Sequence, residues 1–590
     1  MKLLKTGDAK AVYRELSNII KGYVVTEPAC KKFSIDLTCN PDEIKDSHEK
    51  IKIYNTIDDF TLDEIREILK DFKLKETGNF FVDRIIATDD EEIYEKLLPL
   101  KKHCEIVHLT MQQDNLEKQG KQVVFINYEP KIAEILPEYI LSDFIVNRIA
   151  LKKIFEIFLL LEKFPGFNEF IIESNISEEI INEIFMFNDK IEPDSPAIRE
   201  RKENLKNFKD FVYEELNEIN SEILKRVDEE EIKIGGRELL EMNANIQNVS
   251  ELDIFKKIIK DVIDDHIKKI SEKFKIPPAK LSEIFEKNYP PEVNEDEIKF
   301  LLNKINSEIL EEEHGFKVKL ARKLAGKEDF LKSAYDKIIE LDKILAVIKF
   351  YRENNCNLPK ISESNKALYF KNAKNLFLEK EPVIPVSYSL GGELETKKAA
   401  ILTGANSGGK TTLLKTILQM QILAQGGLPV SSEYYEFPLV DEIYFLSKHA
   451  GTLNAGAFER TLKDISKILV SGKKKIVLID ELESITEPGA AARMVSSILE
   501  MLSEKDDFAV VVTHLSEDIL KHIGECVRVD GITATGLDEN LNLIVDRQPK
   551  FNTIGKSTPE LIVEKLYRKS GAGDEERRVY ERILGKMKER

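Results

Sequence analysis

Residues 400–420 read AILTGANSGGKTTLLKTILQM, and this stretch decides the fold of the C-terminal third. An apolar run leads into the pattern G-x-x-x-x-G-K-T, formed by Gly404, Gly409, Lys410 and Thr411, and apolar residues at helical spacing follow it. A strand before the glycines and a helix after them are the context that a P-loop requires. The stretch therefore predicts a site for a nucleoside triphosphate.

The residues of this loop suit a bound phosphate chain. Glycines let successive backbone N–H groups turn toward the phosphates at the positive end of the following helix. Lys410 is expected to reach the β- and γ-phosphate oxygens, and Thr411 to ligate Mg²⁺. We predict ATP and Mg²⁺ as cofactors, and as binding residues Gly404, Ala405, Asn406, Ser407, Gly408, Gly409, Lys410, Thr411 and Thr412.

Two later apolar runs end in polar residues. KKKIVLIDELES (473–484) leads to Asp480 and Glu481, and FAVVVTH (508–514) leads to His514. The carboxyl ends of parallel strands meet at one edge of a sheet, beside the phosphates. We expect Asp480 to hold Mg²⁺ through water, Glu481 to polarise the attacking water, and His514 to hydrogen-bond the γ-phosphate. With Lys410, Glu481 and His514 form the predicted catalytic set, although a lone histidine is more often structural.

The spacing of apolar and charged residues changes twice along the chain. Residues 1 to about 130 mix helical spacing with short apolar runs. From about 138 to 355 the apolar spacing predicts long amphipathic helices that run out and return, and their charged stripes are most simply solvated faces. After about 370, β-branched runs alternate with helical segments, which predicts a mostly parallel α/β sheet of the ABC-type P-loop ATPases. Proline-containing breaks divide the helices at 164–167, 192–196, 275–278 and 289–296.

The bulk composition favours a globular protein of several domains in a reducing compartment. The chain has 590 residues and a net charge of −18, which opposes indiscriminate adhesion to nucleic acid but does not exclude a local basic groove. Its five cysteines form no C-x-x-C pair, so neither a disulfide framework nor a zinc site is predicted. No long apolar segment predicts a leader or a membrane span. We expect a cytoplasmic protein.

The segment TGANSGGKTTLLKTILQMQILAQGGLPV (403–430) closely resembles the MutS ATPase, in the branch of short MutS-like proteins that lack a mismatch-recognition domain. YVVTEPACKK (23–32), HEKIKIYNTI (48–57) and GKSTPELIVEKLYRKSG (555–571) are similar to the flanking parts of that branch. The resemblance implies lever helices, a clamp that encircles DNA, and ATPase domains paired in a homodimer. The implied regions are 1–130 (mixed N-terminal core), 131–229 (helical lever), 230–330 (helical clamp), 331–370 (returning lever helix), 371–560 (ATPase) and 561–590 (helical dimerisation segment).

The chain departs from the family pattern in three places. The loop that the family supplies across the dimer usually carries a serine, whereas GTLNAGAFERTL (451–462) offers Asn454 as the matching nucleotide contact. Where the family has a glycine-rich turn after the catalytic glutamate, this chain has Glu483, Ser484 and Thr486. The mismatch-reading Phe-x-Glu motif is matched only by Phe167, Asn168 and Glu169 in a helical region, which favours an ordinary packed Phe. No nuclease domain is visible, so cutting would need a nuclease partner.

The resemblance supports a DNA-binding ATPase that acts on branched or distorted DNA in repair or recombination control. An ATP-driven clamp on ribosomes or structured RNA stays open as an alternative, because bacterial relatives are linked to stalled ribosomes. A chromosome-structure ATPase would separate the P-loop and the Asp-Glu strand by a long coiled coil, and a transporter would carry a Leu-Ser-Gly-Gly-Gln signature; neither feature is seen. A scaffold with a dead site is disfavoured because Lys410 and Glu481 are present.

Overall fold

The computed structural model divides the chain into two compact units. The first consists of Met1–Phe72, Ile157–Ile171 and Asp336–Arg590, and the second of Lys73–Glu156 and Ile172–Tyr335. The residues that the structure describes are 2–78, 80–109, 122–129, 131–173, 176–229, 253–378, 383–393, 396–405, 408–447, 455–482, 487–538, 541, 543–555, 559–571 and 574–588. None of the described helices is long and apolar enough to cross a membrane.

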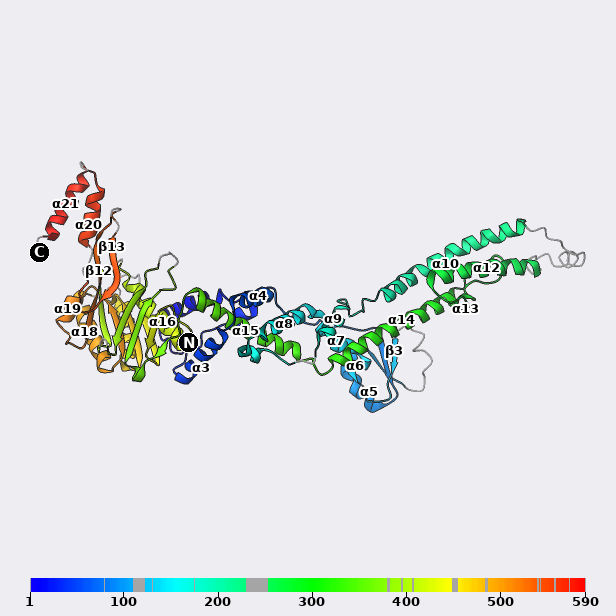
Figure 1. Cartoon of the computed structure of the whole chain (residues 1–590), viewed down its shortest axis with the longest axis horizontal. Coiled ribbons are helices and arrows are strands. Elements are labelled where there is room, and N and C mark those ends of the chain that lie inside the picture. The colour runs from blue at the N-terminus through cyan, green and yellow to red at the C-terminus, as the bar shows by residue number, and fades with distance from the viewer. Residues whose placement is uncertain are drawn as a thin grey trace, which may run out of the picture. The chain divides into compact units, whose positions relative to one another are not determined.

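The centre of the first unit is a six-stranded sheet with the order β13-β12-β7-β11-β10-β9 (Figure 1). Neighbouring strands are parallel except β12 and β13, which form an antiparallel ribbon. Strands β7, β10 and β11 are buried along their whole length, as expected for strands with both faces covered. The strands are β7 (Ala399–Gly404), β9 (Glu442–Leu446), β10 (Lys475–Asp480), β11 (Phe508–Val512), β12 (Arg528–Leu537) and β13 (Leu543–Lys550). The predicted mostly parallel sheet is confirmed.

Helices cover this sheet and supply its core. Residues of α17 and α18 share one apolar cluster with β7, β10 and β11. Helix α16 is buried around almost its whole circumference, because the N-terminal helix α1 also packs on it. The helices are α16 (Lys410–Gln425), α17 (Ala455–Val470), α18 (Pro488–Glu504) and α19 (Ser516–Leu520), followed by the C-terminal pair α20 (Pro559–Lys569) and α21 (Glu575–Lys588).

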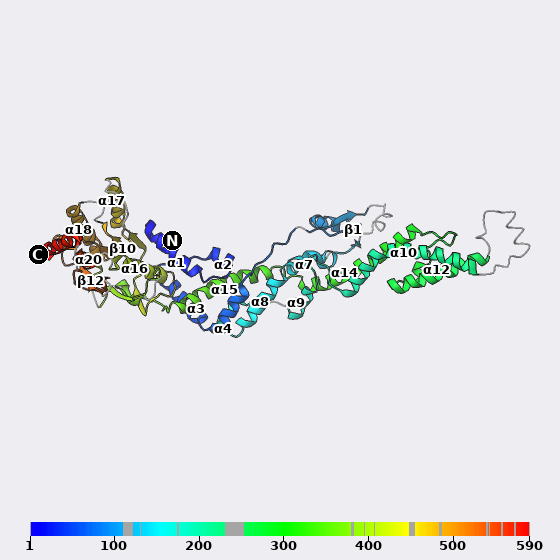
Figure 2. The same ribbon diagram turned by 90° about the horizontal axis from the view of Figure 1, so that it is seen from above.

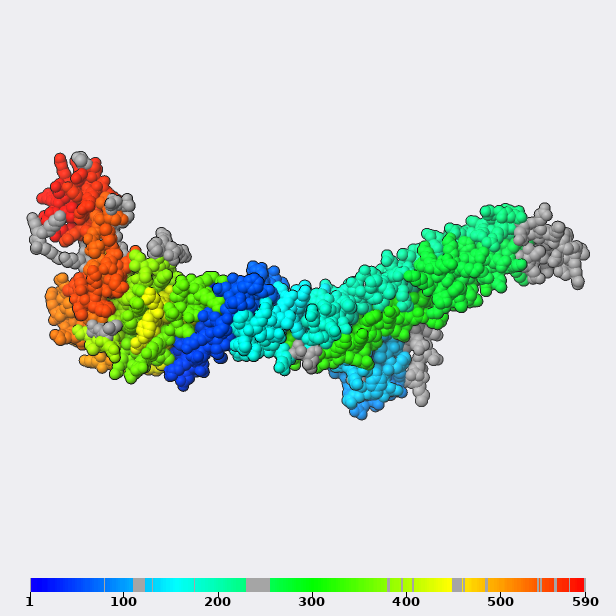
Figure 3. All heavy atoms as spheres, in the orientation of Figure 1, coloured from blue at the N-terminus to red at the C-terminus, as the bar shows by residue number. Residues whose placement is uncertain are grey.

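The first unit also contains a second sheet and the N-terminal helices. The second sheet has the order β4-β8-β5-β6, with β4 (Lys360–Ile361), β5 (Ala367–Ala373), β6 (Val386–Gly391) and β8 (Tyr434–Phe437). The helices are α1 (Gly7–Lys21), α2 (Glu27–Lys32), α3 (Pro41–Tyr54) and α4 (Asp59–Leu69), with the short turns η3 (Pro165–Phe170) and η5 (Glu363–Asn365). Figure 3 shows these N-terminal residues, in dark blue, against the green and yellow residues of the same unit.

The second unit combines a small parallel sheet with long helices. The sheet has the order β2-β1-β3, from β1 (Arg84–Thr88), β2 (Glu105–His108) and β3 (Gln122–Phe125), with α5 (Glu91–Leu97) and η1 (Leu98–Lys102). Figure 2 shows the long helices α10 and α12, which share one apolar core with the start of α14. The helices are α6 (Ile132–Ile135), α7 (Pro137–Val146), α9 (Glu178–Phe185), α10 (Pro196–Glu229), α12 (Asp253–Phe274), α13 (Pro278–Leu281) and α14 (Glu295–Leu324).

The structure refines the regions expected from the sequence. The N-terminal region 1–130 is divided at Phe72 between the two units. The expected returning helix at 331–370 is α15 (Phe330–Glu353), which stops because Asn355 adopts a left-handed φ of 48° and strands β4 and β5 then begin. Helix α8 (Arg148–Leu161) likewise stops before the expected break at Pro165. Of the expected clamp at 230–330, residues 230–252 lie outside the described residues.

Candidate nucleotide site

The P-loop glycines occupy positions that other residues cannot adopt easily. Gly404 ends β7 with a φ of 126°, and a Cβ there would lie 2.0 Å from the carbonyl oxygen of Ile532. Gly409 has a φ of 97° and is the N-cap of α16. A Cβ at Gly408 would lie 2.9 Å from the carbonyl oxygen of Ala405. The chain therefore needs glycine here to turn from the strand into the helix.

Lys410 is buried and points back into the loop that precedes it. Its Nζ donates hydrogen bonds to the carbonyl oxygens of Gly404 at 2.7 Å and Ala405 at 2.9 Å. An ammonium held there lies at the N-terminal end of α16, where helix amides attract anions. Two of the predicted binding residues, Asn406 and Ser407, lie outside the described residues.

The two predicted Mg²⁺ ligands are in contact although 69 residues separate them. Thr411 Oγ1 donates to Asp480 Oδ2 at 2.7 Å. Thr411 begins the first turn of α16 and Asp480 ends β10, so the hydrogen bond joins the P-loop helix to the strand that we expected to carry the carboxylates. A hydroxyl and a carboxylate oxygen at this distance are the ligand types that Mg²⁺ prefers.

Glu481 and His514 meet at the ends of neighbouring strands. The Glu481 amide donates to the carbonyl oxygen of Val512 at 3.0 Å, which ties the end of β10 to β11. Glu481 has a left-handed φ of 50°, an unfavourable conformation for a residue with a side chain that often marks a functional position. His514 Nε2 lies 3.4 Å from Glu481 Oε1, so the predicted base and the predicted γ-phosphate sensor form a pair.

A hollow beside the P-loop was not predicted from the sequence. Its floor includes Gly408, Gly409 and Thr412, and its apolar wall includes Leu378 and Ile384, which are 41% and 54% exposed. Exposed apolar side chains of this kind suit a nucleobase, because the flat faces of the base can pack against them.

Asn375 orients the helix side of this hollow. Its Nδ2 donates to the carbonyl oxygen of Thr412 at 3.2 Å and to Thr416 Oγ1 at 3.0 Å, and its Oδ1 accepts from Gln419 Nε2 at 3.2 Å. Asn375 follows β5 of the second sheet, well before the P-loop in the sequence. No local motif marks it, so sequence reasoning had no signal for its role.

Two of the three departures from the family pattern lie outside the described residues. Asn454, the expected contact across the dimer, lies outside the described residues, and so do Glu483, Ser484 and Thr486. Phe167, in contrast, is fully buried and its ring lies 5.1 Å from that of Tyr54 and 6.2 Å from that of Phe170. The expectation of an ordinary packed phenylalanine is confirmed.

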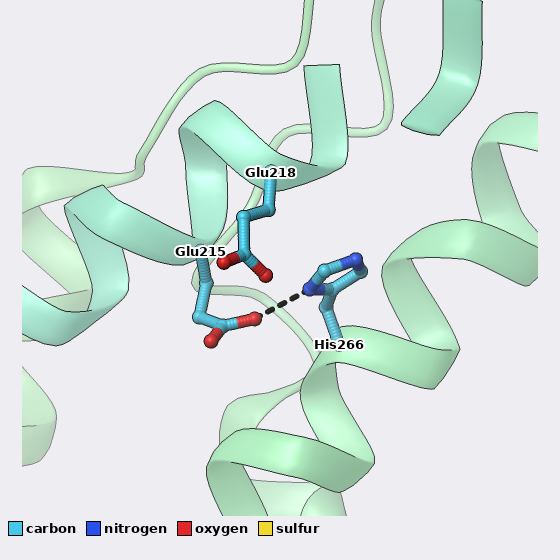
Figure 4. Close-up of side chains that lie close together, drawn as sticks. All are labelled: Glu215, Glu218 and His266. Atoms are coloured by element: carbon cyan, nitrogen blue, oxygen red, sulfur yellow. Dashed lines mark hydrogen bonds and ion pairs between the residues drawn. The ribbon is translucent and has the colours of Figure 1, made fainter. Parts of the chain in front are cut away.

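A second group of ionisable side chains lies in the helical part of the second unit (Figure 4). Glu215 and Glu218 of α10 and His266 of α12 point toward one another closely enough to share one metal ion. Lys269 Nζ, however, lies 2.7 Å from Glu215 and 2.8 Å from Glu218. The hydrogen bonds that Lys269 donates to these carboxylates raise its pKa, and the bond to Glu215 has the larger effect. We interpret the group as an internal ion-pair network between α10 and α12.

Comparison with known proteins identifies the family to which this part of the chain is similar. Residues 400–552 match the family described as MutS domain V, a span that contains Lys410, Asp480, Glu481 and His514. Across 602 aligned residues the chain is 34% identical to the "DNA-binding protein MutS2" of Pyrococcus furiosus, and the alignment covers 99% of both proteins.

Bacterial relatives match over a shorter stretch. The "Endonuclease MutS2" of Fusobacterium nucleatum is 27% identical over 204 residues, which cover 34% of this chain and 26% of that protein. The "Endonuclease MutS2" of Carboxydothermus hydrogenoformans is 32% identical over 248 residues, which cover 40% of this chain and 31% of that protein. The chain thus spans less than a third of either bacterial relative.

Proposed function

Since the chain belongs to the MutS family, in the short branch without a mismatch-recognition domain, we propose that it is a DNA-binding ATPase. The observation that carries this proposal is the contact of 2.7 Å between Thr411 and Asp480. It joins the P-loop helix to the Asp-Glu strand end, which is the arrangement that phosphoryl transfer from a nucleotide requires.

The side chains suit in-line hydrolysis of ATP. Thr411 and Asp480 would hold Mg²⁺, which when bound neutralises charge on the phosphates. Lys410, which donates to the carbonyl oxygens of Gly404 and Ala405, would turn to the β- and γ-phosphate oxygens of a bound nucleotide, because its side chain is flexible.

Glu481 and His514 supply the remaining chemistry in this proposal. Glu481 would accept a hydrogen bond from the attacking water and turn its lone pair toward the γ-phosphorus. His514, at 3.4 Å from Glu481 Oε1, would donate a hydrogen bond to a γ-phosphate oxygen. The left-handed Glu481 lies at the end of β10, and His514 follows β11, the neighbouring parallel strand, so both stand at one edge of the sheet.

The nucleobase would lie in the hollow beside the P-loop. Leu378 and Ile384 would pack against the faces of the base and be shielded from water, and the hydrophobic effect would stabilise binding. Arg547 also lines this hollow and can donate hydrogen bonds to a base or ribose. These contacts would contribute equally to the affinity for a nucleoside triphosphate and for a nucleoside diphosphate.

We further propose that the protein works as a homodimer. Helices α20 and α21 pack on each other, yet each keeps apolar residues exposed at a spacing of four. The exposed residues are Ile562, Leu566, Val579 and Ile583. An apolar face of this kind is covered when two copies pair. The region 561–590 is therefore the proposed dimerisation segment.

The long helices of the second unit would then grip DNA, and ATP would open and close the grip on branched or distorted duplexes. The name of the Pyrococcus furiosus relative, "DNA-binding protein MutS2", supports DNA as the ligand. Because this chain has a net charge of −18, binding must come from local basic groups and should weaken steeply with salt. A nuclease, if one acts, would be a separate partner protein.

The test is ATP turnover by the purified full chain, alone and with a synthetic four-way DNA junction, linear duplex or ribosomes, across a salt series. The Lys410→Ala variant, prepared in parallel, controls for contaminating ATPases. Stimulation by the junction that fades with salt supports the proposal. Stimulation by ribosomes alone would reassign the protein to translation, and turnover equal to that of the Lys410→Ala control would reject the ATPase itself.

A further inference from the structure

The outer edge of β9 is covered by the first residues of the chain. Edge strands offer every second N–H group to solvent, and here each of three successive outward N–H groups has an acceptor from residues 3–8. One acceptor is a backbone carbonyl and two are side chains. The pairs are Ile443 N to Leu3 O at 2.9 Å, Phe445 N to Thr6 Oγ1 at 3.1 Å, and Ser447 N to Asp8 Oδ2 at 2.8 Å.

Asp8 makes the strongest of these contacts. Its Oδ2 accepts from both the amide and the hydroxyl of Ser447, at 2.8 and 2.7 Å. Bonds to a carboxylate are stronger than bonds to a neutral oxygen, so Ser447 is held firmly at the end of β9. Ser447 is the last described residue before the stretch that contains Asn454, the expected contact across the dimer.

Helix α1, which begins at Gly7, carries Asp8 and connects it to the P-loop helix. The buried face of α1 packs on both α16 and β9. Its Tyr13 hydroxyl donates to the carbonyl oxygen of Ile35 at 3.0 Å and accepts from the Ile35 amide at 3.1 Å. Residues 35–38 then contact the far end of α16, where Gln425 Nε2 donates to Thr38 O at 3.0 Å and Thr38 N to Gln425 O at 2.9 Å.

The same N-terminal segment is fastened to α15. Asp342 is fully buried, and a carboxylate tolerates such burial only when donors surround it. Its oxygens accept from Val25 N at 3.1 Å, Thr26 N at 2.7 Å and Thr26 Oγ1 at 2.7 Å. Thr26 is also the N-cap of α2. A shift of α15 would therefore move the segment between α1 and α2.

We infer that residues 3–38 link helix α15 to the nucleotide site, and that Asp8 is a positioning residue for ATP turnover because it holds Ser447 at the end of β9. The inference rests on the proposed ATPase function. Asp8 touches no predicted substrate group, so its effect passes through Ser447 and β9 to β10, where Ile479, the neighbour of Asp480, pairs with Leu446. Thr26 and Asp342 form the other end of the link.

The test compares Asp8→Ala with Glu15→Ala, which removes an exposed carboxylate from the same helix. In the full chain, Asp8→Ala should lower kcat for ATP roughly threefold to tenfold. The Kd for a fluorescent ATP analogue should stay within about twofold, since the P-loop is untouched. Asp8→Asn should restore most of kcat, because its amide oxygen can accept both hydrogen bonds from Ser447. Glu15→Ala should match the wild type.

Two results would overturn the inference. One is an unchanged kcat in Asp8→Ala; the other is a fall in kcat accompanied by an equal loss of nucleotide affinity and thermal stability, which would make Asp8 merely structural. Should Asp8→Ala fail to fold, Asp342→Asn replaces it, and stimulation of turnover by a four-way DNA junction must then fall relative to basal turnover. Absence of turnover in the wild type would reject the proposed function and the inference together, whereas an active, unaltered Asp8→Ala rejects the inference alone.

Discussion

The six-stranded sheet of the first unit and the three-stranded sheet of the second both contain a parallel strand followed by a helix, but they begin that helix differently. After β7, the N-cap of α16 is Gly409, which has no side chain to offer the first amides of the helix. After β1, the N-cap of α5 is Asp90, whose Oδ1 accepts from Ile93 N at 3.0 Å. The same local fold thus begins its helix without a side-chain cap in one unit, as the proposed phosphate site requires, and with a capped amide in the other.

The two sheets also differ in how they use buried charge. In the first unit, Lys410 and Asp480 lie where the proposed phosphates and Mg²⁺ would bind. In the second unit, Arg84 and Glu138 form a bidentate pair at 2.8 and 3.0 Å, and Lys317 Nζ adds a contact of 2.9 Å to Glu138. Buried charge lies at the proposed nucleotide site in one sheet, and it joins α7 and α14 to β1 in the other.

The largest expected effect is that of Lys410→Ala on the first sheet. Removing the ammonium takes away the cation that the proposed phosphates need, so ATP turnover should fall by about 10³-fold, or roughly 4 kcal/mol of transition-state stabilisation. Turnover and nucleotide binding of the purified variant are the measurements. In the absence of nucleotide the variant should lose only the stability that the two hydrogen bonds to Gly404 and Ala405 contribute, and near-normal turnover would contradict the site.

Arg84→Leu should have the next largest effect, and on stability only. The substitution leaves a buried Glu138 with Lys317 as its remaining cation, which should cost about 3 kcal/mol in the free energy of unfolding of the second unit. Chemical denaturation followed by circular dichroism measures this. Basal ATP turnover should stay near that of the wild type.

The double variant Arg84→Leu/Glu138→Leu sharpens this prediction. It removes both charges and their desolvation together, so it should recover more than half of the lost stability. A double variant as unstable as Arg84→Leu alone would show that packing, and not the unpaired charge, causes the loss.

Glu481→Gln should lower ATP turnover by roughly 100-fold while nucleotide binding persists. The amide is similar in size but is a poor base, so ATP should bind and hydrolysis should stall with the proposed dimer held in its closed state. Single-turnover kinetics and the dimer fraction in the presence of ATP test this. Unchanged turnover would refute the role of Glu481 as the base.

Acid should weaken the ion pairs that Glu138 forms with Arg84 and Lys317 in the second unit. Burial alone would raise the pKa of Glu138, but Arg84 and Lys317 outweigh it and lower that pKa to about 2. A carboxylate with a lowered folded-state pKa stabilises the fold above its unfolded value near 4.5, and the stabilisation disappears as the pH falls toward 2. Between pH 6 and pH 3 the stability of the wild type relative to the double variant should fall by about 2 kcal/mol, so the double variant should become the more stable of the two at pH 3. An advantage independent of pH would contradict the lowered pKa.

Asp90→Ala should have the smallest effect, and it tests the side-chain cap at the N-terminus of α5. Loss of the capping bond to Ile93 should cost about 1 kcal/mol in the unfolding of the second unit and leave ATP turnover unchanged. Denaturant unfolding measures the change. A larger loss would mean that Asp90 does more than cap α5.

Much of the candidate site could be predicted because its signals are local. Gly404, Gly409 and Lys410 lie within seven consecutive residues, and the apolar runs before Asp480 and His514 reveal buried strands by composition alone. The sequence predicts a returning helix up to residue 370, whereas the helix ends at Glu353, because a left-handed turn at Asn355 leaves only a weak trace in the sequence. The sequence also predicts one region over 1–130, whereas the structure divides it at Phe72, because short mixed elements do not show which core they join.

Taken by itself, the sequence determined the strand-loop-helix at 400–420, the parallel sheet, the long helices and the family, since each depends on short-range spacing or on similarity along the chain. Only the tertiary structure decided that Asp8 holds Ser447 across 439 residues and that Asn375 orients the P-loop helix across 37. It also decided the contact between Thr411 and Asp480. The physical reason is that the periodicity of apolar residues shows which face of an element is buried. The hydrogen-bond partner of a buried polar group depends instead on which distant segments pack against it in the folded chain.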